Sequence, residues 1–297
     1  HGGADDDFIL GQQGDDDLYG DEGDDDLIGG HNLAAGADGN DTISGGDGAD
    51  VILGDNGLIT RQLIGDNLWQ SYPAPFTAVI RQVTQFYDQD YPYGSDTIRG
   101  DAGDDILYGQ RGDDTLWGGS GDDEIQGGQG DDTLYGQEGN DILIAHMGTI
   151  SRAFDDSGQP VVNASGSWHR DVLLEDIGTL TGMMNISSNA GLDTQALLAS
   201  QMLAADLIVL AGAYQPDGSQ AALAGTDTWD TVMLFIDLAE VDNSTLDGGD
   251  GDDILFGHRG DDTLSGADGD DVIFGDGALN VVPFATDLPH IYNSLRL

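Results

Sequence analysis

The chain has 297 residues, with 56 acidic and only 8 basic side chains, and a formal net charge of −48 at pH 7. This charge excludes nucleic acid and anionic membrane surfaces as direct partners, because no basic patch is available to meet phosphates, and it favours cations. The absence of cysteine excludes disulfides and thiolate metal sites, and no apolar run is long enough to predict a membrane-spanning helix.

The acidic residues are concentrated in a nine-residue repeat, G-G-x-G-x-D-x-U-x, in which U is a large apolar residue. We number its positions 1 to 9. Fourteen copies carry Asp at position 6, and Ile or Leu always follows two residues later. A disordered acidic tail would not keep an apolar side chain at a fixed offset, so we expect a folded repeat. The repeat aspartates are Asp7, Asp16, Asp25, Asp41, Asp50, Asp96, Asp105, Asp114, Asp123, Asp132, Asp141, Asp253, Asp262 and Asp271.

Each repeat combines a turn with a short strand. Positions 7 to 9 alternate and favour β-branched or large apolar residues, which predicts a strand with position 8 pointing inward. Positions 1 to 6 predict a turn, because glycine permits positive φ and a close approach of backbones. Two repeats then form one coil of about 18 residues, and stacked coils give two parallel sheets with a Leu/Ile seam between them.

The turns need a cation. One apolar side chain in nine residues is too little burial to offset the entropy of ordering the backbone, and the adjacent aspartates repel each other. Ca²⁺ suits this chemistry, because it takes six to eight oxygen ligands and accepts both carboxylates and backbone carbonyls; Mg²⁺ is less suitable, because it demands octahedral geometry.

These repeats resemble the hemolysin-type (RTX) calcium-binding nonapeptide repeat. The resemblance implies several Ca²⁺ ions, each between turns one coil apart, so that Asp105 would pair with Asp123, Asp114 with Asp132, and Asp123 with Asp141. The first aspartate of each Asp-Asp pair is interpreted as turn chemistry and outward charge. The implied carbonyl ligands come from turn residues such as Gly103, Gly112, Gly119, Gly121, Gly128, Gly130, Gly249, Gly251 and Gly260.

The predicted fold class is all-β, a calcium-bound parallel β-roll in several runs, interrupted by two inserts. We expect roll runs at 1–54, 95–144 and 248–275, an insert with strands at 55–94, a larger α+β insert at 145–247, and a further insert or cap at 276–297. Both inserts begin with G-x-I-[ST]-R, and we expect Arg61 and Arg152 to pair with carboxylates of the roll; the alternative is a solvent-exposed arginine.

Within the inserts, FTAVIRQVTQFY (76–87) predicts a strand pair or an edge strand. Leu198, Met202, Ala205 and Val209 lie at helical spacing, so we expect one helix ending near Gly212, packed on the roll or, alternatively, binding a partner. The stretch VMLFIDLAEV (232–241) predicts a strand. Asp230 is a possible extra ligand where the chain returns to the roll.

No catalytic motif is present: there is no H-E-x-x-H, no G-x-S-x-G elbow and no phosphate-binding loop. The loose cluster His169, Asp171 and Glu175 is interpreted as structural. We therefore expect no enzyme, but a calcium-binding structural module that folds on Ca²⁺ outside the cell.

The resemblance implies export by Gram-negative type I secretion. We expect part of a large secreted or cell-surface protein of the adhesin or surface-layer type, with calcium, a cell-surface partner or another copy as partners. Alternatives are the RTX portion of an extracellular enzyme whose catalytic domain lies outside this segment, and an active or ligand site in the second insert.

Overall fold

The computed structural model describes residues 1–33, 36–86 apart from 62, 65–67 and 77, 93–146, parts of 148–174, 208–210, 233–235, and 242–275 apart from 259. The chain forms two compact units, His1–His146 with Asp242–Ile273, and Met147–Val241 with Phe274–Leu297. Every regular element in the described residues is a strand. No helix among them is long and apolar enough to cross a membrane.

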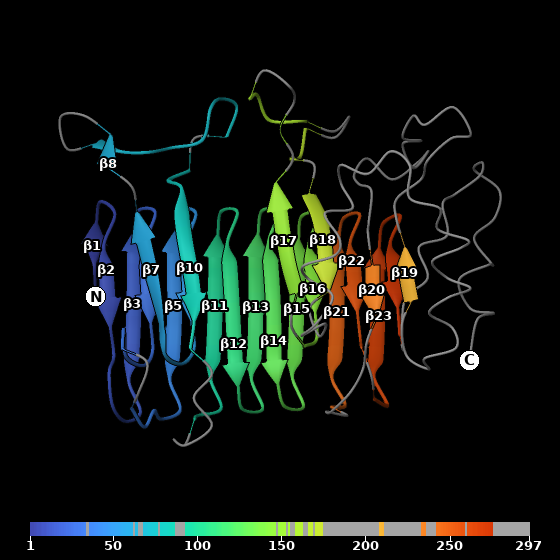
Figure 1. Ribbon diagram of the computed structural model, residues 1–297, viewed down its shortest axis with the longest axis horizontal. Helices are drawn as coiled ribbons and strands as arrows, with labels where there is room; N and C mark the ends of the chain where they lie inside the picture. Colours follow the sequence, from blue (N-terminus) through green and yellow to red (C-terminus); the bar gives the residue numbers. More distant parts are fainter. Residues whose placement is uncertain are drawn as a thin grey trace. The chain divides into compact units, whose positions relative to one another are not determined.

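Two eight-stranded parallel sheets form the first unit, and their strands follow one another in chain order (Figure 1). Sheet A contains β1 (Gly3–Ala4), β3 (Asp17–Glu22), β5 (Thr42–Asp47), β11 (Thr97–Ala102), β13 (Thr115–Ser120), β15 (Thr133–Glu138), β21 (Thr245–Asp250) and β23 (Thr263–Asp268). Sheet B contains β2 (Phe8–Leu10), β4 (Asp26–Ile28), β6 (Val51–Leu53), β12 (Ile106–Arg111), β14 (Glu124–Gln129), β16 (Ile142–Ile144), β22 (Ile254–Phe256) and β24 (Val272–Phe274).

The position 8 side chains form the core between the two sheets, as predicted. Strand pairing is in register, so that Leu116 lies beside Leu134 and Ile98 beside Leu116. The buried cluster consists of Leu18, Leu27, Ile43, Ile52, Ile98, Leu107, Leu116, Ile125, Leu134, Leu143, Ala145, Leu246 and Leu255, with Ile9 and Leu264 partly buried against it. Because each coil places one apolar residue above the last, the seam is continuous along the roll.

The inserts interrupt the sequence but not the sheets. Strand β11 pairs directly with β5, and Thr97 lies beside Thr42 although the first insert separates them. Likewise β21 pairs with β15 across the second insert, with Thr245 beside Thr133. Strands β12 and β22 continue sheet B in the same way. The predicted separate runs are therefore one continuous parallel β-roll.

The turns lie along two edges of the roll. Edge I, which we define as the turns from sheet A to sheet B, consists of 2–7, 20–25, 45–50, 100–105, 118–123, 136–141, 248–253 and 266–271. Edge II, the connections from sheet B to sheet A, consists of 11–16, 29–41, 54–96, 109–114, 127–132, 145–244 and 257–262. Every turn of edge I has the six-residue length of the repeat, and all the long connections leave from edge II.

Two strands of the first insert pack on the outer face of sheet B. Strand β7 (Gly57–Arg61) pairs antiparallel with β10 (Arg81–Gln85), and β8 (Leu63–Ile64) pairs antiparallel with β9 (Leu68–Trp69). A second apolar cluster joins the β7/β10 hairpin to the roll; it consists of Ile28, Val51, Leu53 and Ile59, with Leu10, Val83, Ile106 and Tyr108 packed against them. The strand predicted within 76–87 is confirmed at β10.

Among its described residues, the second unit contains two antiparallel strand pairs. Strand β17 (Gly148–Arg152) pairs with β18 (Arg170–Leu174), and β19 (Ile208–Leu210) pairs with β20 (Met233–Phe235). The strand predicted within 232–241 is confirmed at β20. The predicted helix lies largely outside the described residues, and where its segment is described it forms β19, so the helical spacing does not extend through Val209.

Candidate metal centre

The predicted aspartates of edge I form one unbroken ladder. The backbone N–H of each aspartate donates a hydrogen bond to Oδ1 of the aspartate one coil later. The chain of contacts runs Asp7 to Asp25, Asp50, Asp105, Asp123, Asp141, Asp253 and Asp271, with N···O distances between 2.7 and 3.1 Å. The ladder crosses both inserts, and it brings together Asp105 with Asp123 and Asp123 with Asp141, two of the pairs that the resemblance implies.

Edge II carries the second ladder. Asp16 donates to Asp41, Asp41 to Asp96, Asp96 to Asp114 and Asp114 to Asp132, each from backbone N–H to Oδ1 at 2.8 or 2.9 Å. The next rung is different: Asp132 N–H donates to Ser244 Oγ at 3.1 Å, and Ser244 N–H donates to Asp262 Oδ1 at 2.9 Å. All fourteen repeat aspartates thus lie in two ladders, and Ser244 replaces a carboxylate in one of them.

The second oxygen of these carboxylates is the chemically unusual feature. Asp105 is fully buried, yet its Oδ2 has no hydrogen-bond partner within the described part of the chain. The same holds for Oδ2 of Asp16, Asp25, Asp41, Asp50, Asp96, Asp114 and Asp132. Buried polar atoms are normally satisfied, and a buried carboxylate needs a counter-charge, so repeated orphaned oxygens indicate a missing cation.

Backbone carbonyls from the neighbouring coil converge on the same places. A Cβ added at Gly100 would collide with Asp105 Oδ2 and lie 2.6 Å from the Gly118 carbonyl oxygen; one added at Gly109 would collide with Asp114 Oδ2. Position 1 is therefore glycine because these oxygens occupy the space a side chain would fill. No three Asp, Glu or His side chains among the described residues could hold a metal by themselves, so an ion here requires carbonyl ligands as well, which suits Ca²⁺.

The glycines predicted as carbonyl donors occupy positions 2 and 4, where all nine have φ between 110 and 156°. The carbonyls of Gly103, Gly112 and Gly121 lie against the position 4 glycine one coil later. The carbonyls that share space with Asp Oδ2 come instead from position 1, for example Gly118 and Gly127. These position 1 carbonyls were missed by sequence reasoning, although glycine at position 1 of every complete copy is a signal of close backbone approach.

Burial makes these carboxylates resist ionisation when no cation is present. Desolvation raises the pKa of Asp50 and Asp114 to about 7. Desolvation, followed by the nearby charge of Asp114, raises the pKa of Asp96 and of Asp132 to about 9. A divalent cation between the turns would remove this penalty by supplying positive charge at the buried oxygens.

The first aspartate of each pair has a structural role that sequence reasoning missed. Asp122 N–H donates to Asp104 Oδ1 at 2.9 Å, and Asp131 N–H donates to Asp113 Oδ1 at 3.1 Å. Position 5 therefore forms its own exposed ladder, in which each side chain accepts from the following coil, whereas position 6 accepts from the preceding one. This explains why Asn40, Ser95, Asn140 and Asn243, which keep an acceptor oxygen, can replace aspartate there.

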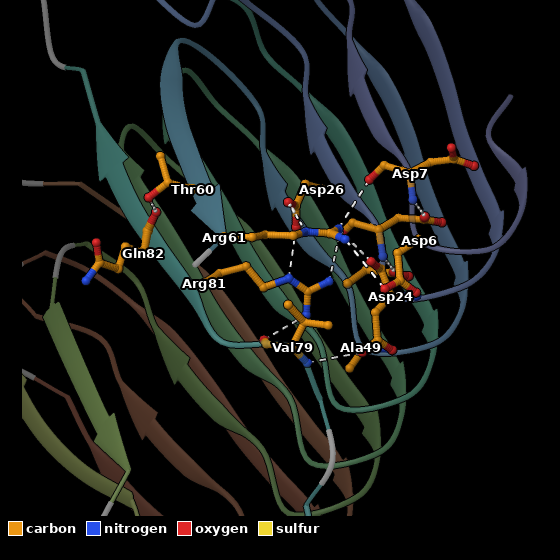
Figure 2. A network of polar contacts seen from close by, with 12 residues as sticks. Asp6, Asp7, Asp24, Asp26, Ala49, Thr60, Arg61, Val79, Arg81 and Gln82 are labelled. Carbon is orange, nitrogen blue, oxygen red and sulfur yellow. Dashed lines mark hydrogen bonds and ion pairs between the residues drawn. The ribbon is translucent and has the colours of Figure 1, made fainter. Parts of the chain in front are cut away.

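An arginine pair joins the first insert to the roll (Figure 2). Arg61 Nε donates to Asp26 Oδ2 at 2.6 Å, and Arg81 Nε donates to Asp26 Oδ1 at 2.9 Å. All three side chains are at least 95% buried. The predicted pairing of Arg61 with a roll carboxylate is confirmed, while Arg81 was missed. Arg152 belongs to the second unit, where its guanidinium lies 5.5 Å from the centre of the Trp168 ring.

Two of the remaining predictions concern residues outside the described part of the chain. These are the possible extra ligand Asp230, and His169 and Glu175 of the cluster interpreted as structural. The described part of the chain rejoins the roll at Asn243–Ser244–Thr245, a half repeat without glycine, whose Leu246 fills the core seam. The signal in the sequence was weak: only the Thr-Leu pair followed by Gly248 marks this coil.

The fold and its ladders define a parallel β-roll whose turns present paired carboxylates and backbone carbonyls to cations. The model of the RTX calcium-binding nonapeptide repeat, in four copies, matches residues 1–31, 28–57, 93–125, 117–149 and 242–281. These segments cover about half of the chain, and the chain belongs to this family of calcium-binding repeats. No curated protein matches the sequence.

Proposed function

We propose that this chain is a calcium-dependent structural module whose roll is completed by Ca²⁺ ions in its turns. The observation that carries the proposal is the set of orphaned, buried Oδ2 atoms repeated along both ladders. In a region with a net negative charge this large, those oxygens are tolerable only with bound cations. Metal binding and folding are then one event.

Each ion would lie between turns one coil apart. Its ligands would be the position 6 aspartates of both turns and carbonyl oxygens of turn glycines. Asp105 and Asp123 with the Gly118 carbonyl represent such a set on edge I, and Asp96 with Asp114 on edge II. On edge II, Ser244 replaces an aspartate in the ladder, so each ligand set that includes this position lacks one carboxylate. The sites on either side of Ser244 would therefore bind Ca²⁺ more weakly.

Calcium-dependent folding fits an extracellular protein. RTX repeat proteins are typically exported by type I systems, and a chain that folds only in calcium would remain unfolded in a low-calcium cytosol and fold outside. We therefore place the module in a large secreted or cell-surface protein of the adhesin or surface-layer type. Its role would be structural, without catalysis of its own, and its partners would be calcium and a cell surface or another copy.

The second candidate is the RTX portion of an extracellular enzyme whose catalytic domain lies outside this segment. The family match favours it equally, because the repeats accompany both kinds of protein. The flanking sequence separates the two: adhesion repeats support the module of a surface protein, and a catalytic domain supports the enzyme.

The test is a calcium titration of chelator-treated protein followed by far-UV circular dichroism, with Mg²⁺ as the control cation. We expect a cooperative gain of β signal with Ca²⁺ and little with Mg²⁺. A chain that is already fully folded in chelator would contradict the proposal, because the carboxylate ladders would then be stable without cations.

A further inference from the structure

The arrangement that marks every ladder site recurs once outside the two ladders. At each position 1 glycine, an added Cβ would meet Oδ2 of the position 6 aspartate of the same turn. Of the other described glycines, only Gly30 meets an aspartate Oδ2 in this way, and the aspartate is Asp38. A Cβ on Gly30 would collide with this oxygen and lie 2.6 Å from Oδ1 of Asn56. Asp38 is at position 3 of its copy, and Asn56 lies in the chain that leaves the roll, so neither belongs to the repeat ligands.

Asn56 is held with its side-chain oxygen toward Gly30. The residue is buried, and its Nδ2 donates a hydrogen bond to the Gly36 carbonyl oxygen at 3.1 Å, while its Oδ1 accepts one from His31 N–H at 2.5 Å. Only the amide nitrogen can donate to a carbonyl oxygen, and only the amide oxygen can accept from N–H, so these two bonds fix the orientation of the amide. The atom that faces Gly30 is therefore an acceptor.

The second oxygen in front of Gly30 is an acceptor as well. Asp38 Oδ1 accepts a hydrogen bond from Gly39 N–H at 2.9 Å, whereas Oδ2 is buried and has no hydrogen-bond partner in the described part of the chain. Asp38 Oδ2 and Asn56 Oδ1 thus face the same space, and the described residues place no donor between them. Two acceptors in one buried space require either a proton on the carboxylate or a cation between them.

The surrounding charge favours a cation over a proton. Burial, followed by the negative charges of Asp41 and Asp16, raises the pKa of Asp38 to about 7. Asp55, beside Asn56 in the sequence, is fully buried, and its Oδ1 has no hydrogen-bond partner within the described structure. Burial, followed by the charges of neighbouring carboxylates including Asp38, raises the pKa of Asp55 to about 10. One proton would leave most of this negative charge unbalanced, whereas a divalent cation balances two carboxylates.

We propose that Asp38 and Asn56 bind one further Ca²⁺ ion, which lies outside the nonapeptide sites and joins turn 29–41 to the start of the first insert. The two segments already run together, because Gly57 N–H donates to the His31 carbonyl oxygen at 2.9 Å. Backbone carbonyls and water would complete the six to eight oxygen ligands of Ca²⁺. The inference rests on the proposed function, which supplies the cation, and it adds a site that the repeat pattern does not contain.

Native mass spectrometry of the full chain at pH 8, over a series of calcium concentrations, counts the bound ions directly. Asp38→Asn should bind one Ca²⁺ fewer than the unmodified protein at saturation and still fold. In this variant Oδ1 can still accept from Gly39 N–H, and the amide nitrogen in place of Oδ2 can donate to Asn56 Oδ1. A hydrogen bond would thus replace the ion.

Gly30→Ala tests the same site without changing any charge. Its methyl group would occupy the space of the ion, and the atoms it meets belong to side chains rather than to the backbone, so the fold can accommodate it. This variant should also bind one Ca²⁺ fewer. Asp47→Asn is the matched control, because Asp47 is at position 3 of its copy, like Asp38, but is exposed, and it should keep every ion. Far-UV circular dichroism at saturating calcium checks the fold of all three variants.

An unchanged ion count in both site variants would overturn this inference and show that Asp38 shares a proton with Asn56 instead. Loss of an ion in Asp47→Asn as well would also overturn it, because the count would then follow total charge. If Asp38→Asn does not fold, the count for Gly30→Ala decides alone. An unmodified chain that binds no Ca²⁺ would instead contradict the proposed function itself.

Discussion

Replacing the ladder aspartate Asp114 with asparagine should change stability in opposite directions with and without calcium. The substitution is nearly isosteric: the amide oxygen can still accept from Asp96 N–H, which now lies 2.8 Å from Oδ1. What disappears is the negative charge at Oδ2, a buried atom without a partner in the described structure. The experiment therefore isolates charge from shape.

The size of the effect in chelator follows from the pKa. Burial raises the pKa of Asp114 from 3.8 to about 7, which corresponds to about 4 kcal/mol of destabilisation once this group is ionised above pH 7. Removing the charge should recover part of that free energy at pH 8. It should also lower the pKa of Asp132, which burial and then the charge of Asp114 raise.

With calcium the sign reverses, because a charged ligand is lost. Affinity for Ca²⁺ follows the number of charged ligands, so the calcium concentration at half-folding should rise about tenfold or more. The assay is far-UV circular dichroism during calcium titration and, separately, the residual β signal in chelator at pH 8. Asp113→Asn is the control, since Asp113 is exposed and adjacent and its substitution keeps the acceptor for Asp131 N–H. An effect of the same sign in both conditions would refute the reasoning.

Three further outcomes are expected. In chelator, the β signal should grow as the pH falls from 8 to 5. Burial raises the folded-state pKa values of Asp96 and Asp132 to about 9, so the stability that their protonation gives the folded state is complete below pH 3.8 and is lost as the pH rises through 9. A flat pH profile by circular dichroism would contradict this. Ser244→Asp should complete the edge II ladder and raise Tm by several degrees in calcium only, with Ser265→Asp on exposed sheet A as the unresponsive control. Gln137→Gly should stabilise the protein by about 1 kcal/mol, because Gln137 is exposed with φ of 84°; unchanged urea midpoints would show that the backbone there is unstrained.

The repeating parts of the fold could be predicted because each copy repeats the same physical constraint. Position 8 must be apolar to reach the seam, and position 6 must be acidic at the turn, so Leu116 and Asp114 could be assigned without a structure. The 18-residue spacing then fixed the register of neighbouring coils. No comparable periodicity links Thr42 to Thr97 or Thr133 to Thr245. The stacking of coils across the inserts is therefore seen only in the strand pairing of the structure.

The missed residues are those whose function depends on a single contact. Ser244 keeps a hydrogen-bond acceptor but no charge, and only its place in the ladder reveals it. Arg81 could not be connected with Asp26, because ion pairs between distant segments leave no spacing in the sequence. Arg61 was recognised only because a similar segment, with Arg152, begins the second insert.

The restriction of every long connection to edge II has a consequence for how such a chain can be lengthened. A new segment introduced between position 1 and position 6 on that edge can leave and return while both adjoining sheets remain paired, as 54–96 and 145–244 demonstrate. A segment of one whole coil, in contrast, lengthens the stack by about 4.8 Å and preserves the alternation of the edges. Edge I thus keeps turns of constant length along the roll, whereas edge II accepts inserted segments of unrelated sequence and length.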